Sequence, residues 1–63
     1  MDGAKLLDEA LSRVESESIR EWANSAHNRP IWEKIAQGAL DKSGGEYDPD
    51  RLCAYLVCVA IGA

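Results

Sequence analysis

The histidine and the two cysteines are the side chains best able to act as nucleophiles, bases or metal ligands. His27 is the one histidine in the sequence, and no recognisable catalytic motif accompanies it. Because a histidine catalyses only beside a nucleophile or a second acid–base group, catalysis at His27 is not expected. His27 lies shortly before Pro30, where an imidazolium suits the negative end of a helix dipole, so we interpret it as a helix-end residue.

Cys53 and Cys58 lie five positions apart in an apolar run. On a helix this spacing separates them by about 140° around the axis, so they can neither share a disulfide nor chelate a metal from one face. The sequence has no CxxC pair, and one histidine is too few to complete a zinc site of familiar spacing. We therefore predict no metal site, no cofactor and no catalytic residue, and we expect both thiols to be free and buried in the core.

Trp22 and Trp32 are the first candidates for contact with another molecule. Each lies beside an isoleucine and near alanines at helical spacing, so both are predicted to anchor the core. Tryptophan is also enriched at binding hot spots, and two are many for a chain of 63 residues. Tyr55, Leu56 and Val59 belong to one apolar stripe later in the chain. We predict that a partner-binding surface draws on these tryptophans and on this stripe.

Helices must position these residues, because apolar side chains recur at spacings of three and four along most of the chain. We predict helices over residues 3–15, 18–27, 30–43 and 49–61, with no sheet. Pro30 suits the first turn of a helix, where its missing N–H costs nothing. Gly44 and Gly45 supply the left-handed conformation that ends a helix. Asp48 and Pro49 are a strong helix start, with the aspartate as cap.

The first two helices are predicted to be separated by a break. Asp2 is a suitable cap for the first helix. The apolar residues before and after Ser16–Ser18 point in directions about 140° apart, so one straight helix would have to bury two different faces. Residues 18–21 have the form of a capping box that restarts the helix. One long helix that contacts different neighbours at its two ends is the alternative.

The last apolar run, Leu52–Ile61, contains no polar group except the Tyr55 hydroxyl. Its length and its Asp-Pro start favour a helix, although Val57 and Val59 also suit a strand. A helix that is apolar on every side must be surrounded by other groups. We therefore predict an all-α fold in a single domain over residues 1–63. It is a small bundle of roughly three to four short helices, in which the C-terminal helix is either central or at an interface.

Charge and hydropathy restrict the class of partner and the location. The net charge is −4, which argues against direct nucleic-acid binding. Met1–Leu11 lacks the basic start and the apolar segment of a signal peptide, and Leu52–Ile61 is shorter than the roughly 20 residues that span a bilayer. Two cysteines without a secretory signal indicate a reducing compartment. We expect a cytoplasmic protein that does not enter a membrane.

Small size, acidity and the lack of catalytic groups predict a protein that is not an enzyme and binds another protein to regulate or inhibit it. Phage and other mobile elements encode many proteins of this size and charge, and the likeness goes no further. The partner's identity is not given by the sequence. A homodimer is expected, because a two-fold partner covers an apolar helix without a second gene product. The alternative is a structural subunit that is stable only within a larger assembly.

A helix-turn-helix DNA-binding protein is rejected. Its reading helix would be the one after the glycine turn, and that helix begins with Asp48 and Asp50. Carboxylates there repel phosphates, and the apolar residues that follow offer few groups to base edges.

Overall fold

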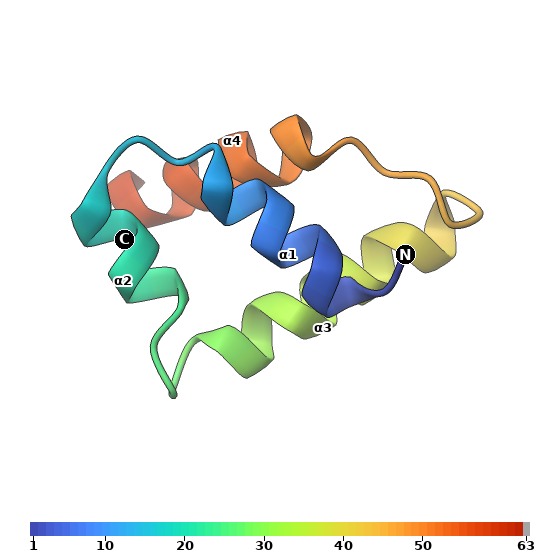
Figure 1. The fold of residues 1–63 in the computed structure, drawn as a ribbon, viewed down its shortest axis with the longest axis horizontal. Helices are drawn as coiled ribbons and strands as arrows, with labels where there is room; N and C mark the ends of the chain where they lie inside the picture. The colour runs from blue at the N-terminus through green and yellow to red at the C-terminus, as the bar shows by residue number, and fades with distance from the viewer. Residues whose placement is uncertain (63) are drawn as a thin grey trace.

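The computed structural model describes residues 1–62 and contains helices joined by short turns (Figure 1). The helices are α1 (Gly3–Ser12), α2 (Glu17–Ala23), α3 (Arg29–Lys42) and α4 (Pro49–Gly62). No strand occurs within this part of the chain, and α1 packs against both α3 and α4. The predicted all-α bundle of short helices is therefore confirmed.

The predicted break between the first two helices is present, but both boundaries differ from the prediction. α1 ends at Ser12 rather than at residue 15. The side chains of Ser12 and Arg13 both donate hydrogen bonds to the Glu9 carbonyl. They therefore occupy the oxygen that would accept the next backbone N–H if the helix continued. α2 begins earlier than predicted, because Ser16 and not Ser18 is its cap. The Ser16 hydroxyl accepts the Ile19 N–H at 3.3 Å.

The end of α2 also lies earlier than predicted, at Ala23 rather than at residue 27. Its last turn is closed by polar side chains from the following turn. The Ser25 hydroxyl and the Asn28 amide both donate to the Trp22 carbonyl at 2.9 Å. These bonds satisfy a carbonyl that a longer helix would have paired with its own backbone.

The remaining caps are those predicted. The Asp2 carboxylate accepts the Lys5 N–H at 2.9 Å at the start of α1. At the end of α3, Gly44 and Gly45 have positive φ angles of 73° and 92°, and the Gly45 N–H donates to the Leu40 carbonyl at 2.7 Å. This hydrogen bond is the one that defines a Schellman motif at the end of a helix. The Asp48 carboxylate accepts the Asp50 N–H at 2.9 Å at the start of α4.

α1 is the central helix of the bundle, and α4 is not. α1 contacts α3 on one side and α4 on the other (Figure 1). Buried apolar side chains from all four helices and from Val14 form one core. They are Leu6, Leu7, Ala10, Leu11, Val14, Ala23, Trp32, Ala36, Leu40, Leu52 and Leu56. Of the two positions predicted for the C-terminal helix, the central one is thus excluded.

Close packing between α1 and α3 depends on Gly3. A Cβ atom at this position would come within 2.7 Å of the Glu33 carbonyl oxygen and 2.9 Å of the Gln37 backbone nitrogen. The Gly3 N–H also donates to the Gln37 side-chain oxygen at 2.9 Å. A glycine is therefore required where the two helices cross.

Ion pairs tie α1 and its C-terminal end to the neighbouring helices. Arg29 of α3 pairs with Asp8 at 2.8 Å and with Glu33 at 3.1 Å, and Arg13 pairs with Asp50 at 2.7 Å. The hydrogen bond that Arg29 donates to the Asp8 carboxylate is the main reason that the pKa of Arg29 is raised above its ordinary value. All of these side chains are partly or largely exposed, so each pair contributes little to stability.

No helix within residues 1–62 combines the length and apolarity needed to cross a membrane.

Candidate functional site

Three aromatic residues that are distant in the sequence form a row across α2, α3 and α4. The rings of Trp22 and Trp32 have centroids 6.0 Å apart at 69°, and those of Trp32 and Tyr55 are 5.8 Å apart at 75°. Both are edge-to-face contacts, the geometry that aromatic quadrupoles favour. Trp32 is 4% exposed, Trp22 is half-buried and Tyr55 is 52% exposed. The row therefore passes through the core at Trp32 and reaches the surface at Tyr55.

The other two candidate residues lie deeper in the bundle. Leu56 is fully buried in the core, so a partner cannot contact it while the bundle is folded. Val59 is half-buried and packs against the core. Of the residues predicted to contact a partner, Tyr55 is the one with most of its side chain in solvent.

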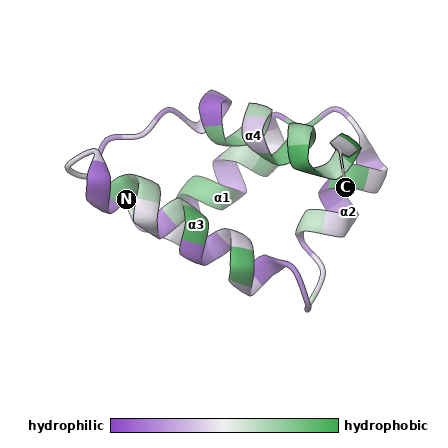
Figure 2. Cartoon of the chain, turned by 180° about the vertical axis from the view of Figure 1, so that it is seen from behind, coloured by the Kyte–Doolittle hydropathy of each residue, from purple (hydrophilic) through white to green (hydrophobic). Residues whose placement is uncertain are grey.

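A second part of α4 is exposed and carries no charge. Ala54, Cys58 and Ile61 face solvent, and we call them the outer face of α4. Ile61 alone is 75% exposed. Figure 2 shows α4 hydrophobic over most of its length after a hydrophilic first turn. The sequence indicates that α4 is apolar on all sides, and the structure shows which of those sides is left uncovered.

The two cysteines are free, as predicted, but their expected burial is only partly correct. Cys53 is half-buried, whereas Cys58 is exposed on the outer face. The reason is the number of neighbours that α4 has. α1 and α2 cover the side that carries Leu52 and Leu56, and no helix within residues 1–62 covers the side that carries Cys58.

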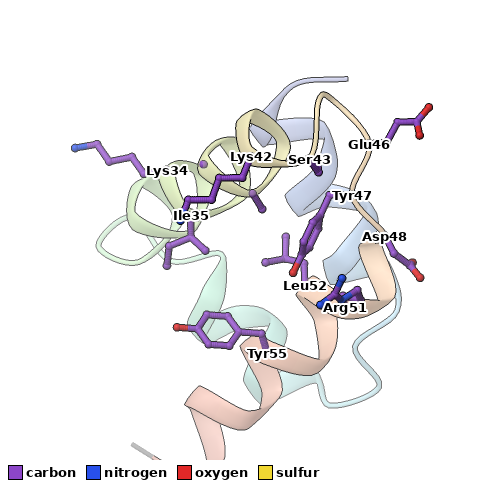
Figure 3. Close-up of a pocket in the computed structure, with 12 residues that line it drawn as sticks. Lys34, Ile35, Lys42, Ser43, Glu46, Tyr47, Asp48, Arg51, Leu52 and Tyr55 are labelled. Carbon is purple, nitrogen blue, oxygen red and sulfur yellow. The ribbon is translucent and has the colours of Figure 1, made fainter.

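A groove of about 670 Å³ lies between α3 and α4, and we call it the α3–α4 groove (Figure 3). Its apolar lining comes from Ile35, Ala39 and Leu52. Lys42 lies on the α3 side of the groove, whereas Tyr47, Arg51 and Tyr55 lie on the side of the turn and α4 (Figure 3). Tyr55, the exposed end of the aromatic row, thus belongs to this groove. The remaining residues that line it are Lys34, Gly38, Ser43, Glu46 and Asp48.

The charge of the groove differs from that of the whole chain. Three of the seven basic residues line it, but only two of the eleven acidic ones. Figure 3 shows the side chains of Glu46 and Asp48 pointing away from the cavity, and Asp48 is held outside by capping α4. The Arg51 guanidinium lies 5.5 Å from the centroid of the Tyr47 ring. Neither Lys42 nor Arg51 forms an ion pair with any residue among 1–62.

Sequence reasoning did not find most of this groove. Lys42, Tyr47 and Arg51 carry no motif, and they meet only because the turn 43–48 folds α4 back beside α3. The one signal in the sequence that pointed to the groove was Gly38. It is a glycine inside a helical apolar stripe, and such a glycine is costly unless packing or binding requires it.

His27 lies exposed in the turn between α2 and α3. The prediction that it ends a helix is wrong, because α2 already ends at Ala23. Across the described residues, no three histidine, cysteine or acidic side chains come together as metal ligands would. The geometry offers two surfaces for contact: an uncharged helix face, and an aromatic groove lined by three basic side chains.

Comparison of the chain with protein-family models, with curated proteins and with solved structures gave no match in any of the three. Its function is therefore inferred from its own residues and their geometry.

Proposed function

We propose that this chain is a small non-catalytic protein that binds another protein and thereby regulates or inhibits it. The observation that carries the proposal is the exposure of α4. No charged side chain occurs from Leu52 to Gly62, yet only Leu52 and Leu56 of this helix are buried. Contiguous exposed apolar surface on a small protein normally marks an interaction site.

Covering this surface would yield a useful free energy. Full burial of an isoleucine or a similar side chain is worth about 1.5–3 kcal/mol relative to exposure. Ile61 is 75% exposed and Tyr55 is 52% exposed. Covering both, Tyr55 by the partner and Ile61 by a second copy, gains an amount comparable with a substantial part of the net stability of about 5 kcal/mol expected for a small domain. An exposed free thiol such as Cys58 persists in a reducing compartment, so we propose the cytoplasm as the location.

A site-specific crosslinking experiment tests the proposal. A photoreactive amino acid is placed at Tyr55 or at Cys58 in the producing cells, and at the exposed Glu21 of α2 as the matched control. We expect the regulated protein to be captured from position 55, a second copy of this chain from position 58, and neither from position 21. Adding the purified chain to that protein should then change its activity. Equal capture from all three positions, or a captured protein whose activity does not respond, would contradict the proposed regulation.

The outer face of α4 is the surface on which we propose that a second copy binds. Ala54, Cys58 and Gly62 are small and lie four positions apart, so two copies of α4 can approach closely along this line. A two-fold pairing buries Ile61 of both copies without a second gene product. Sedimentation equilibrium over a wide concentration range should show association above the monomer mass of 6.9 kDa. Cys58→Glu should abolish this association, and Lys5→Glu on α1 should not.

The alternative proposal, a structural subunit, differs in one observable. A regulator that acts independently should unfold cooperatively when it is produced alone. An obligate subunit should instead show a helical circular dichroism spectrum without a cooperative transition. A molten chain that becomes ordered only with the captured protein would favour the subunit.

A further inference from the structure

We infer that the α3–α4 groove binds an acidic, amphipathic helical segment of the partner protein. This inference rests on the proposed function and specifies the chemistry of the partner. It concerns a surface separate from the outer face of α4, so self-association and partner binding can be altered independently.

Gly38 is the first observation. It lies inside α3, where a glycine costs about 0.5–1 kcal/mol relative to alanine. A Cβ atom there would meet nothing within 4 Å, and its φ angle is not positive. Neither packing within this chain nor backbone conformation therefore requires a glycine. Gly38 does line the groove, and a bare backbone there allows an occupant to approach α3 closely.

Charge complementarity is the second observation. Lys42 and Arg51 stand on opposite walls of the groove and lack acidic partners among the described residues. The two carboxylates at its edge point outward (Figure 3). An otherwise acidic molecule thus presents a local positive site, which selects an acidic occupant and repels a basic one.

The shape and lining of the groove favour a peptide helix over other anions. Ile35, Ala39 and Leu52 form an apolar floor that suits aliphatic side chains at helical spacing. The tyrosines on the walls add apolar area and hydroxyl groups at the rim. A nucleic acid is disfavoured, because three cations are few for a phosphate backbone and the whole chain carries a net charge of −4.

The inference is tested with two synthetic peptides of opposite charge. Both carry leucines at i, i+3 and i+4 spacing. All remaining positions are glutamate in the first peptide and lysine in the second. Each is labelled with fluorescein, and binding to the full chain is followed by fluorescence anisotropy. We expect the glutamate peptide to bind at least about tenfold more tightly than the lysine peptide, with affinity that falls as salt is added. Equal binding of both peptides, or no binding of either, overturns the inference.

Variants assign the binding to the groove. Gly38→Leu places a side chain in the open space and should abolish binding of the glutamate peptide, while the helix keeps or gains stability. Lys42→Glu should weaken binding about tenfold, whereas the matched charge reversal Lys5→Glu, outside the groove, should leave it unchanged. Retained binding by both groove variants overturns the assignment.

Two further measurements separate this inference from the other proposals. A fluorescein-labelled single-stranded oligonucleotide that binds more tightly than the glutamate peptide would overturn the choice of a peptide. Loss of self-association in Gly38→Leu would show that the groove receives a second copy and not a partner.

If Tyr55 captures a protein that Gly38→Leu still binds normally, the proposed function stands and the groove inference fails. If the glutamate peptide binds while position 55 captures no protein, the groove is supported and the proposed function fails.

Discussion

The helix α3 has two sides with opposite character, and two glycines mark the difference. On the side that meets α1, a Cβ atom at Gly3 would lie 2.7 Å from a backbone oxygen of α3. On the side that faces the α3–α4 groove, a Cβ atom at Gly38 would meet nothing within 4 Å. The first glycine is needed for the chain to pack on itself. The second has no such role inside the chain.

The same contrast holds for charge. On the α1 side, Arg29 is paired with Asp8 at 2.8 Å and with Glu33 at 3.1 Å. On the groove side, Lys42 and Arg51 form no ion pair with residues 1–62. One side of α3 is therefore satisfied by the fold, and the other is left with groups that another molecule can satisfy. Substitutions on the two sides should separate stability from binding.

The largest effect should come from the core on the α1 side. Leu6→Ala removes a fully buried side chain from the central helix and should lower the free energy of unfolding by about 2–5 kcal/mol. A loss of this size approaches the whole stability of a small domain, about 5 kcal/mol. Urea denaturation followed by circular dichroism measures it. The control is Ile31→Ala, because Ile31 is 49% exposed and should change stability by less than about 0.5 kcal/mol. Similar losses for both variants would contradict the assigned core.

Gly3→Ala should have the next largest effect. The added methyl group meets backbone atoms of α3, which cannot rotate away as a flexible side chain could. Overpacking of this kind should cost about 1–3 kcal/mol of unfolding free energy, despite the better helix propensity of alanine. The same urea titration measures it. An unchanged midpoint would mean that α1 and α3 are not in close contact.

Gly38→Ala should change stability in the opposite direction. Its methyl group enters open space, so only the gain in helix propensity remains. We expect the free energy of unfolding to rise by about 0.5–1 kcal/mol. Gly3→Ala serves as the matched control, since the substitution is identical and only the surroundings differ. A loss of stability in Gly38→Ala would show that the chain itself fills the groove.

The smallest effect on stability, and a clear effect on reactivity, is expected at the two thiols. In the single chain Cys58 is exposed and Cys53 is half-buried, so a thiol reagent should modify Cys58 faster in native protein dilute enough for the copies to separate. The variants Cys53→Ala and Cys58→Ala isolate each rate, and denaturant should make the two rates similar. Slow labelling of Cys58 in native protein that becomes fast on dilution would place this residue in the interface between copies. Fast labelling of both residues would contradict the partial burial of Cys53.

The sequence by itself determined the features that depend on neighbouring residues. Asp2 caps α1, Gly44 and Gly45 end α3, and Asp48 caps α4 through a bond to the Asp50 N–H. Each of these bonds joins groups within a few positions, so residue type and spacing are sufficient to predict them. The break near residues 16–18 was predictable for the same reason. The sequence could not decide whether Ser16 or Ser18 is the cap. Either hydroxyl could accept a hydrogen bond from the backbone N–H three positions later.

Only the tertiary structure decided which apolar surfaces are covered. The run from Leu52 to Ile61 is apolar on every side, and no periodic pattern within it distinguishes the buried Leu56 from the exposed Cys58 and Ile61. That distinction depends on α1, which lies far away in the sequence and covers one side of α4. The groove has the same origin, because Lys42 and Arg51 line one groove only when the chain turns between α3 and α4. Local pattern fixes where helices begin and end, whereas burial and the meeting of distant charges depend on how the helices pack together.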